Sequence, residues 1–418
     1  MSAARKEILA AIERDRDRLI GFLRDFIRAA SPNPPGDTRK AAEHVIGFLK
    51  SEGLEPAVIA PNPEMPNIVA SFAGSGEGRH LVLNGHMDVF PAANDGTWTH
   101  GPWSGAMVDD HIWGRGAVDM KSGTTASLFA FVYLHRLRDQ LPGKLTLTAV
   151  SDEETFGPWG MRYLMEHHPE VHGDCCLSGE PTGPQIIRFG EKGPLWLRFE
   201  VRTAGAHGAY PHLSHSSIAI AARLIADLGK VAAMQVAVPG NLAAVLDQSS
   251  SAVESAFGKG ASLVMREVTF HPGTIAGGLK VNMIASTCSF EGDFRLPVGA
   301  SKERLLAEIT GIMAHYPEAS FEEIQFSAPN WCDPEHAMVQ ALKANAKALT
   351  GVEPCPAIGL GGTDTRLWRY RGIPAYAYGP SPKTMGQSDE RIAVAEFLHI
   401  VRTHALSAFD YLSTPHDR

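Results

Sequence analysis

Helix and strand patterns alternate through the first half of the chain, and this alternation constrains the fold more than any other feature. The expected helices cover residues 1–30, 38–52 and 120–137, and the expected strands cover residues 67–72, 80–84 and 144–152. The helices are amphipathic or buried, and the strands are apolar. Such alternation predicts an α/β protein in which helices cover the faces of one sheet.

The pattern changes near residue 192. The segment PLWLRFEVRTAG alternates apolar and polar residues, as a half-buried antiparallel strand does. The α/β pattern resumes from Ala300. The sequence therefore predicts a discontinuous catalytic domain, residues 1–189 and 299–418, interrupted by a smaller α+β domain of residues 190–298.

Length, charge and cysteine usage narrow the class of protein. The chain has 418 residues, more than one core comfortably holds, so two domains are expected. The net charge is −8 and no long basic run is present, which argues against a nucleic-acid partner. No apolar stretch approaches the roughly 18 residues of a spanning helix, so no membrane partner is expected. The five cysteines include no C-x-x-C pair, and a reduced, cytoplasmic protein is the expectation.

Acidic and histidine side chains follow the expected strands. They are His86 and Asp88 in NGHMDVFP, Asp119 in WGRGAVDMKSG, Asp152, Glu153 and Glu154 in SDEETFG, and Glu180 in GEPTG. In α/β sheets, ligands bind beyond the carboxyl ends of the strands. The sequence therefore predicts one site at this edge of the sheet.

A divalent metal explains why such side chains would gather. Carboxylates that lie close together repel one another unless a cation is present. A mixture of imidazole and carboxylate ligands suits Zn²⁺, Mn²⁺ or Co²⁺. His86 is expected to bind through one ring nitrogen while Asp88 orients the other N–H.

Taken singly, the acidic residues have structural explanations. Asp119 could cap the helix that follows it. The pair Glu153–Glu154 could lie on a solvated surface, and Glu180 could be a turn residue. Four such coincidences in one order are improbable, which favours the metal site.

The motifs NGHMDVFP, WGRGAVDMKSG, SDEETFG and GEPTG, in this order and spacing, resemble those of one metallopeptidase family. Its members include acetylornithine deacetylase, succinyl-diaminopimelate desuccinylase, aminoacylase, carnosinase and glutamate carboxypeptidase. The resemblance covers nearly the whole chain. It implies a three-layer sandwich of the zinc-exopeptidase type, interrupted by a lid and dimerisation domain, and a homodimer or larger homo-oligomer.

The resemblance also implies roles for the acidic cluster. His86, Asp119 and Glu180 would hold one metal, and Asp119 would bridge to a second metal held with Glu154. Glu153 would be the general base, because a metal lowers the pKa of a bound water to about 7, within reach of a carboxylate.

In the inserted domain, AGAHGAYPH resembles the segment whose histidine, here His207, crosses a dimer interface to polarise the scissile carbonyl. KVNMIASTCSFEGDFRLP resembles the strands that hold substrate through an asparagine and an arginine, here Asn282 and Arg295, although Arg295 could instead form a surface salt bridge. GLGGTDTRLW resembles the loop near the substrate carboxylate, where the backbone of Gly361, Gly362 and Thr363 would approach an anion.

One position departs from the family pattern. The family ends its site with His-x-x-Asp/Asn-Glu, and here MGQSDE places Gly386 where the histidine belongs. Glycine has no side-chain ligand, so one metal per subunit is expected. Two further possibilities are that His100 or His111 replaces the missing ligand and a second metal binds, or that hydrolysis has been lost.

These observations predict a metal-dependent hydrolase of a C–N bond in a small substrate that carries a carboxylate, either an N-acyl amino acid or a dipeptide. The alternative enzyme is a deaminase of an activated aromatic amine such as 5-nitroanthranilate, with one metal. Four aromatic residues near the motifs could line its pocket, although core packing is the expected role of each: Trp103, Trp113, Trp159 and Tyr210. The alternative from another class is a non-catalytic ligand-binding homologue.

Overall fold

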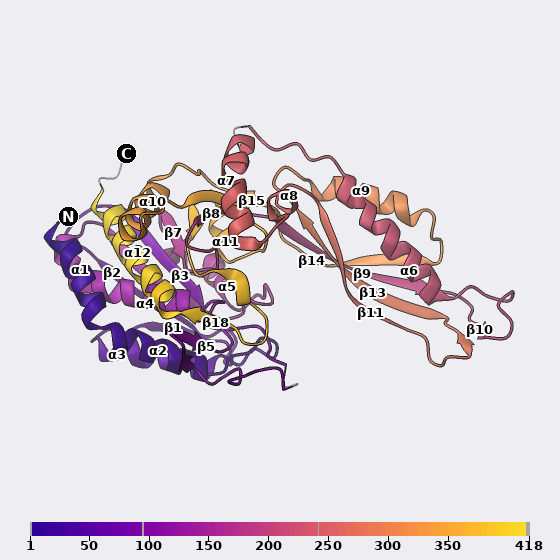
Figure 1. Cartoon of the computed structure of the whole chain (residues 1–418), viewed down its shortest axis with the longest axis horizontal. Coiled ribbons are helices and arrows are strands. Elements are labelled where there is room, and N and C mark those ends of the chain that lie inside the picture. The colour runs from indigo at the N-terminus through magenta and orange to yellow at the C-terminus, as the bar shows by residue number, and fades with distance from the viewer. Residues whose placement is uncertain (1, 94–95, 241, 415–418) are drawn as a thin grey trace.

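The computed structural model describes residues 2–93, 96–240 and 242–414, and it shows two lobes joined side by side (Figure 1). Among these residues the large lobe contains a sheet of nine strands. Its path runs through β1 (Ala57–Ile59), β2 (Asn67–Ala73), β6 (Lys144–Val150), β3 (His80–His86), β7 (Cys175–Ser178), β17 (Ala375–Ala377), β8 (Ile186–Glu191) and β15 (Asn330–Trp331), and β16 (Cys355–Gly359) pairs with β8.

Helices cover both faces of this sheet. One face packs on α1 (Ala3–Arg14), α2 (Arg16–Arg28), α3 (Arg39–Ser51), α4 (Lys121–Arg136), α10 (Ala337–Thr350) and α12 (Val394–Ser413), and the other on α5 (Met161–His167) and α11 (Thr365–Arg369). Side chains of a strand alternate between faces. In β3, Leu81 and Leu83 enter the first core and Val82 enters the second. The expected three-layer α/β sandwich is confirmed.

The small lobe is an antiparallel sheet with helices on one face. Its strand order is β11 (Thr269–Gly277), β13 (Thr287–Leu296), β9 (Gly193–Arg202) and β14 (Ala319–Phe326), and its helices are α6 (Ser217–Leu228) and α9 (Lys302–Met313). Along β9, buried and more exposed residues alternate, as the sequence pattern indicated. Four of these buried residues, Leu195, Leu197, Phe199 and Val201, form the centre of this core.

The structure differs from the expected domain boundaries in two places. First, α9 and β14 lie beyond residue 298 but belong to the small lobe, because β14 pairs with β9 in the register Phe321↔Phe199. The α/β pattern therefore resumes after Phe326 and not at Ala300. Second, α7 (Leu242–Phe257) and α8 (Ala261–Val264) leave the small lobe and pack on the large one, where Leu246 and Val253 enter its core (Figure 1).

Two small sheets complete the fold. β18 (Arg391–Ala393), β5 (His111–Trp113) and β4 (Ala106–Val108) pair beside the large lobe, and β10 (Ala206–His207) pairs with β12 (Met283–Ile284) at the far end of the small lobe (Figure 1). Among the helices of the described ranges, none combines the length and the apolar character that crossing a membrane requires.

Candidate metal centre

The acidic cluster forms where three neighbouring parallel strands end. His86 is the last residue of β3, Glu153 follows β6, and Glu180 follows β7, while Asp119 lies just before α4. Parallel strands end at the same edge of a sheet, so these side chains meet there. The structure thus brings together residues that are 94 positions apart, from His86 to Glu180.

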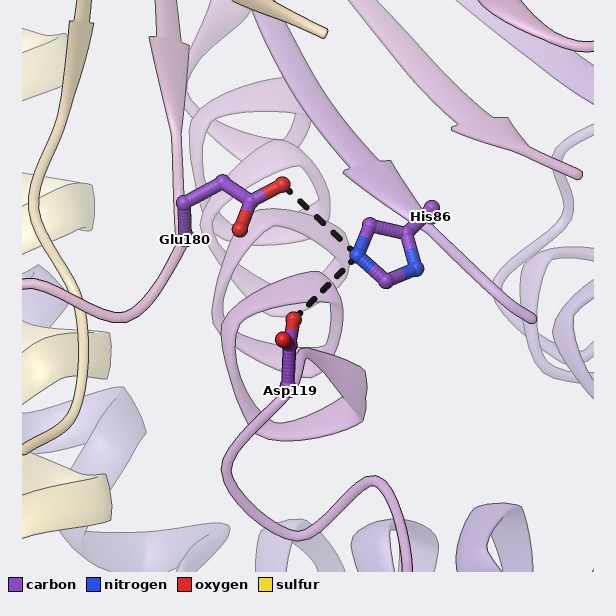
Figure 2. A group of neighbouring side chains, drawn as sticks. All are labelled: His86, Asp119 and Glu180. Atoms are coloured by element: carbon purple, nitrogen blue, oxygen red, sulfur yellow. Dashed lines mark ion pairs between the residues drawn. The ribbon is translucent and has the colours of Figure 1, made fainter. Parts of the chain in front are cut away.

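Three of these side chains have the spacing of metal ligands. The Nε2 atom of His86 lies 3.4 Å from Oδ1 of Asp119 and 3.6 Å from Oε1 of Glu180 (Figure 2). Ligands of a tetrahedral metal with bonds of about 2.0–2.1 Å lie roughly 3.3 Å from each other. His86 Nε2 and Glu180 Oε1 are buried and have no hydrogen-bond partner among the residues that the structure describes. A divalent cation fits these three residues.

The orientation of His86 differs from the prediction. Its Nδ1 atom lies 2.9 Å from the main-chain oxygen of Asp88 and 3.6 Å from the Asp88 carboxylate. The carbonyl therefore orients the ring, because it is the closer acceptor. The Asp88 carboxylate instead accepts hydrogen bonds from Asn33 Nδ2 at 2.9 Å and from the main-chain N–H of Glu154 at 3.1 Å. It holds in place the loop that carries the two glutamates.

Glu153 and Glu154 project from this loop into the site. Glu153 is 7% exposed, and its Oε2 atom lies 3.9 Å from His86 Nε2. Its Oε1 atom lies 3.8 Å from the Nη1 atom of Arg366. Glu153 Oε1 and Glu154 Oε1 are both buried without a hydrogen-bond partner in the described ranges. Glu153 is therefore beside the three candidate ligands, where a general base is required.

Burial and mutual repulsion set the protonation of the cluster. Burial raises the pKa of Glu153 and Glu154 well above the usual range, and it raises the pKa of Glu180 to about 8. Burial opposes the charge on His86, but contact with Asp119 and the nearby glutamates overcomes it and raises the pKa of His86. Without a cation the cluster therefore retains protons, and a divalent ion can replace them.

Glu390, the last residue of the C-terminal motif, positions Asp119. Its Oε1 atom accepts hydrogen bonds from the main-chain N–H groups of Gly116, Val118 and Asp119 at 3.0, 2.9 and 3.2 Å. Its Oε2 atom pairs with Arg115 at 2.5 Å. The motif thus fixes the loop before α4 through its glutamate.

Gly386 lies at the rim of the site, since its neighbours Met385 and Gln387 line the adjoining cavity. It has a φ of +72°, and a Cβ atom there would lie 3.4 Å from the Phe90 ring. In the described part of the chain, the group able to hold an ion comprises His86, Asp119 and Glu180, and neither His100 nor His111 belongs to it. The His111 ring instead contacts Asp109 O at 2.7 Å.

A cavity of about 690 Å³ adjoins the cluster, and residues of both lobes line it. Its charged lining outside the cluster is cationic: Arg188, Arg295 and Lys383. Arg295 both lines the cavity and forms the salt bridge that was the alternative, with Asp293 at 2.8 Å. None of Trp103, Trp113, Trp159 and Tyr210 is among the described lining residues of this cavity, so they do not form the aromatic pocket considered for a deaminase. Core packing, the expected role, is wrong for Trp159 and Tyr210, which are 40% and 52% exposed.

The glycine-rich loop, Thr363 included, lines the cavity, but both hydrogen-bond donors of Thr363 are already engaged. Its N–H and hydroxyl donate to the buried Glu191 carboxylate at 3.1 and 2.9 Å. A Cβ atom at Gly362 would lie 3.0 Å from the Phe156 ring, so the absence of a side chain there makes room for this ring. At Gly361 the surroundings are open, and the predicted backbone approach to an anion is sterically free there.

His207 and Asn282 lie apart from the cavity of their own chain. Gly208, which follows His207, donates its N–H to the main-chain oxygen of Asn282 at 2.8 Å, so the two predicted residues are neighbours. His207 ends β10 and Asn282 directly precedes β12, and these two strands form the end of the small lobe that points away from the large lobe (Figure 1). Of the three residues predicted in this lobe, only Arg295 lines the described cavity within its own chain.

Two arginines near the cluster were not predicted. Arg188 is 7% exposed, and its Nε atom has no hydrogen-bond partner among the described residues. Arg366 is 2% exposed and stacks 4.3 Å from the Phe156 ring centroid. An arginine within the apolar strand segment IIRFGE is unusual, because charged residues are seldom buried without a partner, and this signal could have identified Arg188.

Comparison with known proteins agrees with this geometry. The family described as peptidase family M20/M25/M40 matches residues 82–409. A succinyl-diaminopimelate desuccinylase of Cereibacter sphaeroides is 28% identical over 389 residues, covering 90% of this chain and 94% of that protein. One of Gluconacetobacter diazotrophicus is 29% identical over 396 residues, covering 91% and 94%.

Solved structures share the fold. The M20 family metallo-carboxypeptidase Sso-CP2 of Sulfolobus solfataricus has a TM-score of 0.80 at 18% identity, covering 94% of this chain and 99% of that chain. The dipeptidase Dug1p of Saccharomyces cerevisiae has a TM-score of 0.82 at 16% identity, with full coverage of both chains. These relatives do not favour the deaminase or the non-catalytic alternative. The chain belongs to peptidase family M20/M25/M40 and is a metal-dependent hydrolase that acts on C–N bonds.

Proposed function

We propose that the chain hydrolyses the C–N bond of an N-acyl amino acid or a dipeptide, with one Zn²⁺, Mn²⁺ or Co²⁺ ion held by His86, Asp119 and Glu180. The observation that carries this proposal is the buried Glu153 carboxylate, 3.9 Å from His86 Nε2 at the wall of the cavity. A divalent metal, when bound, activates a water and polarises the carbonyl under attack.

Glu153 acts on the proton in this proposal. Its carboxylate accepts the proton of the attacking water and returns it to the leaving nitrogen. Burial raises the pKa of Glu153 in the metal-free cluster, and the positive charge of a divalent ion held by the neighbouring ligands would lower it and leave the carboxylate free to take up a proton. The Nη1 atom of Arg366 lies 3.8 Å from the other carboxylate oxygen and places a positive charge beside it.

The lining of the cavity supports a substrate that carries a carboxylate. Arg188 lies within the cavity wall with its Nε atom unpaired among the described residues, and Arg295 and Lys383 add two more positive charges. A buried guanidinium without a full set of acceptors gains most from an anionic ligand.

We also propose that the active unit is a homodimer in which His207 and Asn282 serve the partner's site. Their position at the far end of the small lobe supports this proposal, because they cannot act where they lie (Figure 1). Nearby apolar side chains are strongly exposed, with Leu279 at 88% and Val281 at 101%. A second copy would cover such side chains.

Hydrolysis of N-acyl amino acids and dipeptides tests the proposal. Protein stripped of metal should be inactive, and addition of Zn²⁺, Mn²⁺ or Co²⁺ should restore release of free amine. A matched control is Glu166→Gln, which removes an exposed carboxylate outside the cavity and should leave the rate unchanged. The absence of hydrolysis with every metal and every substrate would contradict the proposed function.

A further inference from the structure

We propose that the substrate carries a bulky apolar group, aromatic or branched aliphatic, and that the end of α7 forms the wall that selects it. This inference rests on the proposed function and names the class of substrate for the same site. It follows from the path of one segment, residues 242–265, and from the side chains that surround it.

In the sequence this segment lies between elements of the small lobe, but in the structure it packs on the large lobe. The chain leaves the small lobe, forms α7 and α8 against the large lobe, and returns to the small lobe at β11 (Figure 1). Leu246, Val253 and Met265 anchor it in the core of the large lobe. Its residues 255–258, at the end of α7, line the cavity. The segment therefore adds a wall to the cavity that the sheet and its loops do not provide.

The position of Phe257 in this wall is fixed by its surroundings. The Glu254 carboxylate accepts hydrogen bonds from the N–H groups of Gly260 and Ser262 at 2.6 and 2.9 Å, which closes the turn after α7. On the other side, Ala256 packs against the loop that follows Glu180, where a Cβ atom at Gly183 would lie 3.4 Å from it. The end of α7 is thus fixed, and Phe257, which packs against the core of the large lobe, lines the cavity that adjoins the metal cluster.

Other apolar side chains continue this wall. Phe156 of the large lobe and Trp196 of the small lobe both line the cavity, with ring centroids 5.8 Å apart. Phe90 and Met385 also line it and remain 40% and 37% exposed. Apolar surface left exposed in a cavity favours an apolar ligand, since covering it removes it from water.

The charges that line the cavity also favour a substrate with a carboxylate and an apolar group. The acidic lining residues of the cavity are Asp119, Glu153, Glu154 and Glu180, all in the metal cluster, and the other charged lining residues are cations. Among the described lining residues no carboxylate is left to receive an ammonium group of the substrate. We therefore expect a substrate with a carboxylate at one end and an apolar group, without a second amine.

A substrate series tests the inference. It contains N-acetylphenylalanine and N-acetylleucine, with an apolar side chain, and N-benzoylglycine, with an apolar acyl group. N-acetylglycine and N-succinyl-diaminopimelate are the comparison substrates. Since a single methylene in an apolar pocket is worth about 10–200-fold in kcat/KM, at least one apolar substrate should exceed N-acetylglycine by about 100-fold. The favoured member also tells whether the wall receives the acyl or the amine side.

Variants connect the preference to α7. Phe257→Ala should lower the ratio of kcat/KM between the favoured apolar substrate and N-acetylglycine by about tenfold. Phe257→Leu keeps an apolar side chain and should lower the ratio less. The control is Leu263→Ala in the same segment, because Leu263 is 58% exposed and outside the cavity lining. Its ratio should equal that of the wild type.

Two outcomes would overturn the inference while leaving the hydrolase intact. One is a higher kcat/KM for N-succinyl-diaminopimelate than for every apolar substrate, and the other is an unchanged ratio in a folded Phe257→Ala protein. Calorimetry with 4-phenylbutyrate and butyrate gives a readout that needs no turnover. Tighter binding of 4-phenylbutyrate without hydrolysis of any substrate would support the wall and contradict the proposed function.

Discussion

The metal edge of the large lobe and the far end of the small lobe are built in opposite ways. At the metal edge, polar side chains are buried and cross-linked: the Asp88 carboxylate fixes the glutamate loop, and Glu390 fixes the loop of Asp119. At the far end, β10 and β12 form a sheet of two strands, and Val281 beside them is 101% exposed. Hydrogen bonds within the chain hold the side chains of the metal edge in place, whereas the far end has a small sheet and exposed apolar side chains.

The difference teaches what each region lacks. Buried, unpaired carboxylates cost free energy, and a divalent cation removes that cost. Exposed apolar side chains next to a candidate catalytic histidine would be covered by the second copy that we propose. We therefore expect the metal edge to act with a bound divalent ion, and the far end to act with a partner subunit.

The largest effect is expected at the metal edge. Glu153→Gln should lower kcat by about 10²–10⁴-fold, because it removes the general base. Metal content should stay close to that of the wild type, since Glu153 is not one of the three candidate ligands. Retention of more than roughly a tenth of the wild-type kcat would show that Glu153 is not the base.

The next effect is expected at the far end of the small lobe. His207→Ala should lower kcat by about 10²–10³-fold, as loss of a group that stabilises developing negative charge does. His215→Ala is the matched control, because His215 is an exposed histidine of the same lobe. Its kcat should be that of the wild type.

Mixing the two inactive proteins tests whether the metal edge of one subunit and the far end of another form a shared site. After subunit exchange, His207→Ala and Glu153→Gln should form heterodimers with one intact site, so part of the activity should return. If both variants are inactive and the mixture stays inactive after exchange is verified, the two regions do not share a site.

A third effect is expected in stability. An acid with a raised folded pKa stabilises the protein at low pH, and this contribution is lost as the pH rises. For Glu180 the loss extends from its ordinary 4.5 to about 8, and the raised pKa of His86 acts in the same direction. The Tm of metal-free protein should therefore fall by several degrees between about pH 5 and about pH 8.

Bound metal should remove this loss, because it binds the deprotonated ligands more tightly as the pH rises. Glu180→Gln in the metal-free protein should reduce the dependence, since one of the titrating groups is gone while His86, Glu153 and Glu154 remain. A Tm of metal-free wild type that rises over the same pH range would contradict the protonated cluster.

The smallest effect is expected at Gly386. Gly386→His should allow a second ion to bind, which metal analysis of the purified protein can count. Because Gly386 has a φ of +72°, a side chain there should cost on the order of 1 kcal/mol of stability. Gly386→Ala carries the same backbone strain without a ligand, and it should bind no additional ion. Equal metal content in the two variants would show that this position does not complete a second site.

The sequence predicted the layers and the cluster because both depend on local patterns. The strand that ends at His86 carries apolar side chains on both of its faces, as a buried strand does. His86 and Glu180 meet at one edge of the sheet because their strands are parallel. The sequence could not show which atom orients His86, because every residue has a main-chain oxygen. Only the folded loop brings the main-chain oxygen of Asp88 to 2.9 Å from His86 Nδ1.

The domain boundaries were harder to predict for a similar reason. The strand ASFEEIQF of β14 has only a weak alternation, and its place beside β9 depends on pairing with residues about 120 positions away. The return of α7 to the large lobe depends on tertiary contacts of Leu246 and Val253, which an amphipathic pattern does not assign to one core or another. The place of Phe257 in the cavity wall could not be predicted either, because it depends on this packing of α7.

Titration of metal into metal-free protein, followed by the rate of hydrolysis of an N-acyl amino acid, tests the central claim most directly. If His86, Asp119 and Glu180 form a one-metal hydrolytic site, the rate should rise in proportion to added metal and level off at about one ion per subunit. A rate that levels off only at two ions per subunit, or that stays at zero with metal in excess, would contradict it.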